Sequence, residues 1–485
     1  MRFPPPGHFR DPAAVRARLR ELELDFDLDD AVQPDGALAQ PIALLGRTLD
    51  NRFCAQPMEG WDGTAAGAPS AHTLRRWRRF GRSGCALVWG GEAFAVRGDG
   101  RANPNQLCLH MDSERDLAAL LHELCLGRRE QGLDDDGALV GLQLTHSGRF
   151  ARPAGPLAPR IAHHHPLLAR KYGLDPATPL LTDVELEAIG ADFVAAARLA
   201  WRAGFAFVDV KCCHGYLLHE LLGAHTRPGP YGGDLAGRMR LFARIVQDIR
   251  RECPGLGVGV RLSALDTTPF APVATNGGAG APMPVLPEDG DCDPRRLHFG
   301  WQADATAAAP DLGEAIAFLR RAHELGAALA NVTLGSPYWN PHLQRPAAYP
   351  PSDGYQPPAD PLVFAAVHLR ATRLLARALP DLPLVGTGYT YLQEWLPHTA
   401  QWAVGRGDAA FCGLGRLLLS YPELPADLLA GRELQHRLWC RTFSDCTTAP
   451  RNGMLSGCFP LDPYYRAMPE AGRLKMLKMT GRKPQ

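Results

Sequence analysis

Side chains able to bind a polar ligand accompany short apolar runs of the sequence. Lys211, His214 and Tyr216 stand at or just beyond the end of one run, and Gln143 and Arg261 lie within two others. An amide and a permanent cation both donate hydrogen bonds, and a lysine can donate to a carbonyl or pair with a carboxylate. These residue types indicate a site for an electron-rich ligand, provided that the fold brings the runs together.

Aromatic and polar residues follow the apolar run that ends near residue 335. They are Tyr338, Trp339, Asn340 and His342. Aromatic walls with a few polar contacts are typical of small-molecule pockets. We therefore expect Tyr338 and Trp339 to bind the substrate; packing beneath a neighbouring loop is the alternative.

Eight short, mostly apolar runs predict parallel strands that are covered on both faces. Helical patterns separate them, and the helix predicted over 181–204 has a capping box at Thr182 and Glu185 and a terminating Gly204. This alternation predicts an α/β fold, a closed (β/α)8 TIM barrel. A doubly wound open sheet is the alternative, although no GxGxxG follows the first strand. The expected strands are 51–57, 85–93, 139–146, 204–212, 257–264, 329–335, 382–388 and 409–415.

Two segments, 147–179 and 266–310, are longer than ordinary loops, and each follows a predicted strand. Loops in this position lie on the active face of such a barrel. Residues outside the strand and helix pattern form both ends of the chain. We therefore expect an N-terminal extension over 1–40, a barrel over 41–430 and a C-terminal extension over 431–485.

The charge balance argues against a nucleic-acid partner, because 52 basic residues face 51 acidic ones and the net charge is +1. The chain has neither a secretory apolar run at its start nor an uncharged stretch of about 18 residues that could span a bilayer. Its twelve cysteines then indicate reduced thiols or metal ligands. We expect a cytoplasmic enzyme with a small-molecule substrate and no membrane partner, and leave homo-oligomerisation open.

Seven blocks in order along residues 45–430 resemble the old yellow enzyme family of FMN-dependent NADH:flavin oxidoreductases. The longest resembles the family's HxAHGYLL and YGG motifs; another, Gln143–Arg149, matches QLxHxGR. Each block lies at the carboxyl end of a predicted strand. The blocks are Asn51–Met58, Gly91–Arg101, Gln143–Arg149, Phe205–Phe242, Val260–Asp266, Val385–Thr390 and Gly413–Pro425.

The resemblance implies FMN as cofactor, with NADH or NADPH as electron donor. Gln143 and Arg261 would bind the pyrimidine edge of the flavin, where a cation stabilises the negative charge of the reduced form. Glycines permit close backbone approach to a phosphate, and a helix start favours its charge. The further cofactor-binding residues that it implies are Pro57, Met58, Glu59 and Ala93 beside the flavin, and Gly388, Tyr389, Gly415 and Arg416 at the phosphate.

The resemblance also implies that Lys211 and His214 bind the substrate carbonyl and that Tyr216 donates a proton. Lys211 stands where the family more often has histidine, and Glu59 where it often has threonine or cysteine. An ionised Glu59 would oppose negative charge on the flavin, so it is protonated, points away or belongs to the substrate pocket. We hypothesise an electrostatic pair of Glu59 and Lys211.

A subgroup that includes dienoyl-CoA reductase and trimethylamine dehydrogenase carries a four-cysteine iron–sulfur motif beyond the barrel. Cys440, Cys446 and Cys458 stand at nearly the same spacing, but the second position holds Phe443. We therefore expect a remnant site without a cluster, these cysteines being only weak metal candidates. The subgroup's C-terminal nucleotide-binding domain is expected to be absent.

These features together predict an ene-reductase, in which NAD(P)H reduces FMN and the flavin reduces an activated C=C bond. The same residues also suit the reverse direction, as a dehydrogenase or demethylase of an amine or carboxylate. A flavin-binding subunit of a larger complex is the third interpretation.

Overall fold

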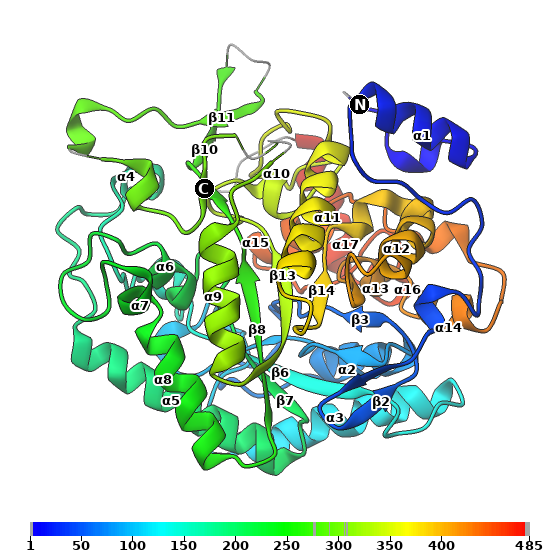
Figure 1. Ribbon diagram of the computed structural model, residues 1–485, viewed down its shortest axis with the longest axis horizontal. Helices are drawn as coiled ribbons and strands as arrows, with labels where there is room; N and C mark the ends of the chain where they lie inside the picture. The colour runs from blue at the N-terminus through cyan, green and yellow to red at the C-terminus, as the bar shows by residue number, and fades with distance from the viewer. Residues whose placement is uncertain (1–2, 275–277, 291, 305, 307–308, 481–485) are drawn as a thin grey trace.

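The computed structural model describes residues 3–274, 278–290, 292–304, 306 and 309–480. Within them eight parallel strands form a closed barrel, because β4 pairs with both β3 and β6 (Figure 1). The predicted TIM barrel is therefore confirmed. A short strand, β5 (Ala93–Ala95), also pairs with β6. The barrel strands are β3 (Phe53–Ala55), β4 (Leu87–Val88), β6 (Leu139–Thr145), β7 (Phe207–Val210), β8 (Gly257–Ser263), β13 (Ala327–Thr333), β14 (Leu384–Gly386) and β15 (Phe411–Leu414).

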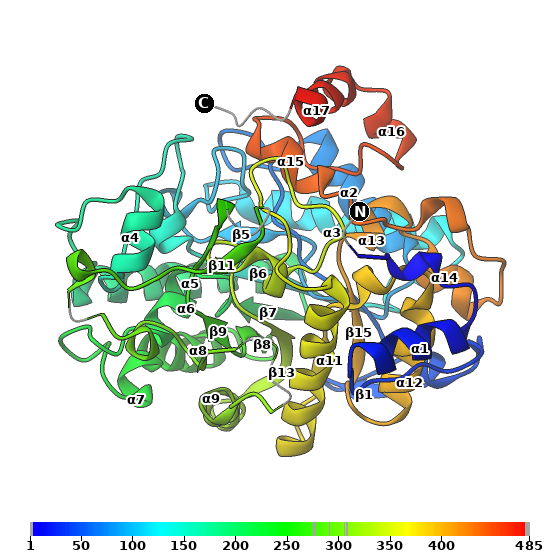
Figure 2. The ribbon, with the colours of Figure 1, turned by 90° about the horizontal axis from the view of Figure 1, so that it is seen from above.

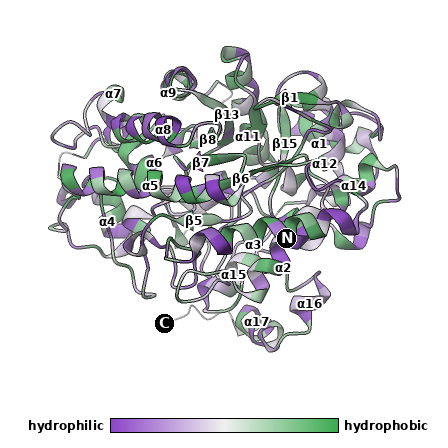
Figure 3. Cartoon of the chain, turned by 90° about the horizontal axis from the view of Figure 1, so that it is seen from below, coloured by the Kyte–Doolittle hydropathy of each residue, from purple (hydrophilic) through white to green (hydrophobic). Residues whose placement is uncertain are grey.

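Helices connect successive strands and cover the outside of the barrel. Figure 3 shows apolar residues along the strands and polar residues on outer helices such as α8, which is how an amphipathic helix packs on a sheet. The capping box predicted at Thr182 and Glu185 is formed at the start of α5. The main covering helices are α2 (Ala71–Arg82), α3 (Ser113–Glu130), α5 (Asp183–Ala203), α8 (Arg240–Glu252), α9 (Gly313–Glu324), α11 (Pro361–Ala378), α12 (Leu396–Gly405) and α14 (Leu424–Leu429).

Two of the helical patterns between the predicted strands are each divided in the structure. The pattern over 237–253 begins within a short helix, α7 (Leu235–Arg238), which Met239 separates from α8. The pattern over 391–407 combines the 3-10 helix η8 (Tyr389–Trp395) with α12, and Gln393 within η8 has a positive φ of 53°. A residue in that conformation cannot continue a helix, so the axis changes direction there.

The two long loops contain short elements of their own, although 275–277, 291, 305 and 307–308 of the second lie outside the described residues. The first holds η4 (Gly148–Phe150) and α4 (Pro166–Tyr172). The second holds β9 (Asp266–Thr267), β10 (Phe270–Pro272), β11 (Gly280–Pro282), η6 (Pro287–Asp289), η7 (Pro294–Arg296) and β12 (Trp301–Gln302). Lys171 joins the loops, because its ammonium donates to the carbonyl of Phe270 at 2.7 Å.

Both ends of the chain pack against the barrel's helices. At the N-terminal end, Arg18 of α1 (Pro12–Glu21) pairs with Asp360 at 2.6 Å, which holds α1 beside α11. At the C-terminal end, three helices lie together near α2 (Figure 2): α15 (Asp445–Arg451), α16 (Pro463–Arg466) and α17 (Pro469–Thr480). The remaining elements are η1 (Pro6–His8), η2 (Ala37–Ala39), β1 (Ile42–Leu44), β2 (Arg47–Leu49), η3 (Gly98–Gly100), α6 (Leu217–Leu222), α10 (Pro341–Gln344), α13 (Leu417–Ser420) and η9 (His436–Leu438).

Large side chains fill one end of the barrel interior. The ring of Phe207 packs edge-on against Trp89, with 5.4 Å between centroids, and both are buried. Gly141 admits this ring, because a Cβ at that position would lie 2.3 Å from Phe207 Cζ.

We therefore expect Gly141→Ala to destabilise the fold by about 1–3 kcal/mol through overpacking, as measured by urea unfolding. The control is Gly472→Ala in α17, where a Cβ would meet nothing within 4 Å and a helical alanine should be neutral or slightly stabilising. Equal free energies of unfolding for the two variants would contradict the packing argument.

Candidate active site

The buried carboxylate of Asp209 organises the centre of the barrel. Its Oδ2 accepts from Gln143 Nε2 at 2.6 Å and from Trp89 Nε1 at 2.7 Å, and its Oδ1 accepts from the backbone N–H of Arg261 at 2.7 Å. Burial raises the pKa of Asp209, while these donors oppose the rise. One carboxylate therefore links β6, β7 and β8 and fixes Gln143 beside Arg261.

Arg261 is buried and reaches across the barrel to the first strand's loop. Its Nη1 donates to the carbonyl of Pro57 at 3.3 Å, while its Nε has no hydrogen-bond partner among the described residues. Ala93 stands opposite Gln143 in the strand register. The structure thus gathers three of the predicted flavin-edge residues, Pro57, Gln143 and Arg261, with Ala93 beside them.

A hydrogen-bonded pair of side-chain amides, Gln56 and Asn331, lies beside Pro57 and was not predicted from the sequence. Asn331 Nδ2 donates to Gln56 Oε1 at 2.7 Å, and the remaining polar atoms, Gln56 Nε2 and Asn331 Oδ1, are buried without a partner in the described chain. The only signal in the sequence was that Gln56 and Asn331 are polar residues within two predicted strands, 51–57 and 329–335.

The predicted phosphate glycines follow β14 and β15. Gly388 has a φ of 91°, and a Cβ there would lie 2.9 Å from that of His368, so the turn requires glycine. Tyr389 is buried, with its ring against Gly386, which leaves its backbone as the part able to meet a ligand. A Cβ at Gly415 would lie 3.9 Å from Met58 Sδ, so Gly415 faces the Met58 side chain.

Two arginines meet beside Gly415 without a counter-charge. Arg416 Nη2 donates to the carbonyl of Pro346 at 2.8 Å, and Arg345, which the sequence gave no reason to choose, donates to the hydroxyl of Thr447. In the described part of the chain neither arginine forms an ion pair with a carboxylate, and Arg416 Nη1 and Arg345 Nε lack partners. Burial, and then the Arg416 cation, lower the pKa of Arg345 to about 9. Paired cations of this kind favour a bound anion.

The predicted proton donor, Tyr216, lies between Glu59 and Lys211. Its hydroxyl donates to Glu59 Oε2 at 2.5 Å and lies 3.4 Å from that of Tyr338, and Lys211 Nζ is 4.0 Å from the centre of its ring. Burial lowers the pKa of Lys211, and nearby Glu59 partly offsets this. Burial raises the pKa of Tyr216 well above its usual value, and Glu59 raises it further.

The hypothesised Glu59–Lys211 pair is therefore not a direct one. No ion pair joins the two within the described residues, and Glu59 instead accepts the Tyr216 hydroxyl. Two other carboxylates near Lys211 in the sequence also have other partners. Asp209 accepts from Gln143, and Glu220 accepts from Arg149 at 2.9 Å. The amino group of Lys211 faces the ring of Tyr216, where a cation–π contact stabilises its charged form.

The backbone of His214 has a left-handed conformation, which fixes the position of its imidazole ring. Its φ is 62°, its backbone N–H donates to Ser263 Oγ at 3.0 Å and its carbonyl accepts from Ser336 Oγ at 2.8 Å. Its Nε2 lies 3.2 Å from Gln344 Nε2. Burial, and next the Arg261 and Lys211 cations, lower the pKa of His214 well below its usual value, so the imidazole is neutral near pH 7.

The two predicted substrate-binding aromatics have different surroundings. Tyr338 stacks on Phe150 with 3.6 Å between centroids and presents its hydroxyl to that of Tyr216. Trp339 packs against Gly215, where a Cβ would lie 1.9 Å from the indole, and its ring centre is 5.5 Å from that of His219. Tyr338 therefore lies beside Tyr216, whereas Trp339 packs behind it against Gly215 and His219.

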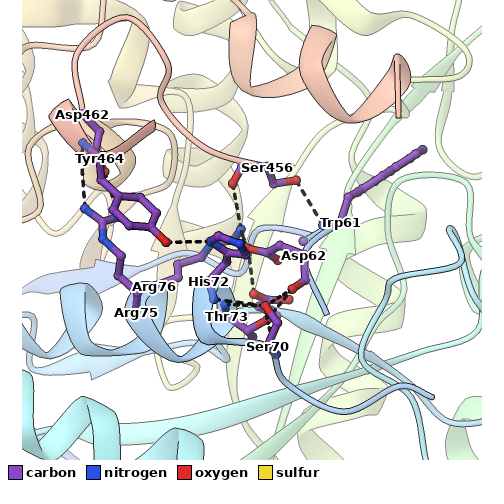
Figure 4. Close-up of polar contacts among 12 residues, drawn as sticks. Trp61, Asp62, Ser70, His72, Thr73, Arg75, Arg76, Ser456, Asp462 and Tyr464 are labelled. Carbon is purple, nitrogen blue, oxygen red and sulfur yellow. Dashed lines mark hydrogen bonds and ion pairs between the residues drawn. The ribbon is translucent and has the colours of Figure 1, made fainter. Parts of the chain in front are cut away.

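A buried charge network lies directly behind Glu59. Arg76 of α2 pairs with Asp62 and, at 2.7 Å, with Glu92, and it donates to the carbonyl of Ser456 at 3.3 Å, which joins the C-terminal segment to the barrel (Figure 4). Arg75 adds a bidentate contact to Asp462 at 2.9 and 3.0 Å. Burial raises the pKa of Glu92 to about 8, since one arginine cannot fully balance two buried carboxylates.

The three C-terminal cysteines line one small cavity of ≈ 20 Å³ together with Arg416. All three are free thiols, and burial raises the pKa of Cys440 and Cys458. The described residues contain no group of three or more His, Cys, Asp or Glu side chains arranged to hold a metal ion. Cys440, Cys446 and Cys458 thus lie around one cavity, and the expected remnant site without a cluster stays a prediction.

The family model described as the NADH:flavin oxidoreductase / NADH oxidase family matches residues 37–273. Over these residues, slightly less than half of the chain, the sequence is similar to that family. The NADPH dehydrogenase of Listeria welshimeri is 33% identical over 229 residues, which are 46% of this chain and 61% of that protein. The NADPH dehydrogenase of Bacillus subtilis is 30% identical over 240 residues, which are 48% of this chain and 64% of that protein. The matched segments thus span less than two thirds of these relatives.

Solved structures confirm the fold. A 2-naphthoyl-CoA reductase complex superposes with a TM-score of 0.63 at 17% identity, covering 89% of this chain and 58% of that one. The old yellow enzyme from Pichia sp. AKU4542 superposes with a TM-score of 0.56 at 19% identity, covering 83% of this chain and 89% of that one. The resemblance to the old yellow enzyme family is thus confirmed, and FMN with an NAD(P)H donor is the cofactor set of that family. Across the described residues no helix is long and apolar enough to cross a membrane.

The chain's residues suit FMN. Buried donors without a partner, on Arg261 and Gln56, face the barrel interior, and the uncompensated Arg345 and Arg416 suit a phosphate.

If Arg345 binds the phosphate, Arg345→Met should weaken FMN binding by roughly 10- to 100-fold, the cost of a charge-assisted hydrogen bond. Because the pKa of Arg345 is about 9, wild-type affinity should fall as pH rises through 9, and this fall should be smaller in the variant. Quenching of flavin fluorescence on titration with apoprotein measures both. Arg320→Met on exposed α9 is the control, and unchanged affinity in Arg345→Met would contradict the role.

The charge network predicts a pH-dependent stability. Between the ordinary glutamate pKa, about 4.3, and the raised value of about 8, folded Glu92 keeps a proton that the unfolded chain has lost. Stability should therefore fall as pH rises through this window, and Glu92→Gln should reduce that fall. Arg76→Met should cost about 3–5 kcal/mol at pH 7 by leaving buried carboxylates unpaired. Urea unfolding at pH 5 and pH 8 tests both, and an undiminished pH dependence in Glu92→Gln would refute the assignment.

Proposed function

We propose that this protein is an FMN-dependent oxidoreductase that reduces the C=C bond of a small α,β-unsaturated carbonyl compound with NAD(P)H. The observation that carries the proposal is the convergence of Lys211, His214 and Tyr216 beside Arg261. The names of its relatives, NADPH dehydrogenase and NADH:flavin oxidoreductase, support the electron donor.

The cofactor would lie across the barrel mouth. Gln143, Arg261 and the backbone of Pro57 and Met58 would hold the flavin edge, with Ala93 and Glu59 beside it. The phosphate would be held by backbone groups of Gly388, Tyr389 and Gly415 and by the side chains of Arg416 and Arg345. Bound FMN would supply hydride transfer from NAD(P)H to the β-carbon of the substrate.

The chain's own residues bind and polarise the substrate. Neutral His214 and the Lys211 ammonium donate hydrogen bonds to the substrate carbonyl, which draws electrons from the C=C bond. Tyr216 delivers a proton to the α-carbon. Tyr338, stacked on Phe150, forms an aromatic wall, and Trp339 supports His219 and Gly215 behind it.

One contact favours a second candidate, oxidation of a saturated substrate. The hydroxyl of Tyr216 donates to Glu59, an arrangement in which Tyr216 can accept a proton from a substrate carbon while passing its own to a carboxylate. Flavin bleaching by saturated amines or carboxylates in the absence of NAD(P)H would identify this direction.

Replacement of the proton donor tests the leading proposal. Tyr216→Phe should slow reoxidation of the reduced flavin by a cyclic enone about 10²-fold or more, the usual contribution of a general acid, because nothing else donates at the α-carbon. Reduction by NADPH should persist. Anaerobic stopped-flow absorbance separates the two steps, and reoxidation at the wild-type rate would refute the assignment.

A further inference from the structure

We propose that Glu59 is the proton relay of Tyr216, carrying protons between the tyrosine hydroxyl and solvent. The inference rests on the proposed function, and it assigns a catalytic role to a position where the family often has threonine or cysteine.

The contact geometry leads from a buried acid to an accessible one. Tyr216 is only 4% exposed, so its hydroxyl exchanges protons slowly unless a neighbour passes them on. Glu59 Oε2 lies 2.5 Å from that hydroxyl, on a partly exposed loop after β3. Tyr338, the other hydroxyl in reach at 3.4 Å, is half-buried like Glu59, but burial of its hydroxyl raises its pKa to about 12. Glu59 is therefore the group suited to the exchange.

Charged groups from three directions face this pair. Lys211 lies over the Tyr216 ring from β7. Glu92 lies behind the loop, close enough that a Cβ on Gly60 would be 2.4 Å from its Oε2, and Arg76 of α2 neutralises it. Glu59 and Glu92 repel one another when both are ionised, which favours proton retention within the cluster.

The protons balance at every step of the reduction. The α-carbon forms a C–H bond as the O–H bond of Tyr216 breaks, and both electrons of the reduction come from NAD(P)H by way of hydride delivery to the β-carbon. The tyrosinate then takes the proton of the Glu59 carboxylic acid, and the Glu59 carboxylate takes one from water. No further reductant is needed.

The protonation of Glu59 also decides where the hydrogen of Tyr216 points. An ionised Glu59 accepts that hydrogen and turns it away from the substrate, whereas a protonated Glu59 donates to the phenol oxygen and leaves the hydrogen free. Each turnover after the first therefore depends on Glu59 to return a proton to Tyr216.

The test compares Glu59→Gln and Glu59→Asp with Glu187→Gln. Glu187 of α5 accepts the hydroxyl of Tyr231 at 3.1 Å, so it offers the same pairing far from the barrel mouth. Wild type and each variant, loaded with FMN, are reduced anaerobically with NADPH, and 2-cyclohexen-1-one is then mixed in. Flavin absorbance follows reoxidation in this single turnover, and consumption of excess NADPH follows repeated turnover.

Glu59→Gln should keep single-turnover reoxidation near the wild-type rate, since Tyr216 already carries its proton, but slow repeated turnover on the order of tenfold or more. Glu59→Asp should retain repeated turnover, and Glu187→Gln should match wild type in both measurements. Acetic acid added to Glu59→Gln should restore part of the repeated turnover, which a purely structural defect would not allow. If wild type turns over repeatedly and Glu59→Gln does so at the same rate, the relay is refuted. If the enone fails to reoxidise wild type, the proposed function fails, and the relay in reduction with it.

Discussion

The site depends on one buried carboxylate. Asp209 accepts three hydrogen bonds, and their donors lie on β6, β8 and the segment after β4. A carboxylate in an apolar barrel is unfavourable unless its oxygens are fully paired, so these donors cannot move independently. This constraint fixes the positions of the Gln143 amide and the Arg261 backbone. The fixed backbone in turn limits where the guanidinium of Arg261 can lie.

Charge imbalance shapes the rest of the barrel mouth. Arg261, Arg345 and Arg416 all have nitrogen atoms without partners in the described chain, while the carboxylates behind Glu59 share a single arginine, Arg76. Positive charge without a counter-ion favours an anionic cofactor, and crowded carboxylates favour proton retention. The buried arginines without partners and the crowded buried carboxylates thus form two regions with opposite electrostatic character.

The two departures from the family pattern act on the same residue. Lys211 lies over the ring of Tyr216, and Glu59 accepts its hydroxyl. Considered one at a time in the sequence, each looked like a change in substrate binding, and the structure connects the two through Tyr216 rather than by a direct ion pair. Their common target became visible only when the loop after β3 met the end of β7.

The sequence by itself determined the barrel, its eight strands and the capping box of α5, because apolar runs, helix periodicity and caps are local signals that act within a few residues. It also indicated that Arg261 and Gln143 would meet, since parallel strands present their carboxyl ends at one face. Only the tertiary structure decided that Arg345 joins Arg416, that Glu59 binds Tyr216 and that Arg76 draws Ser456 to the barrel. Those contacts join residues separated by long stretches of chain, and they depend on side-chain reach and on the competition of buried charges for partners, which no local pattern records.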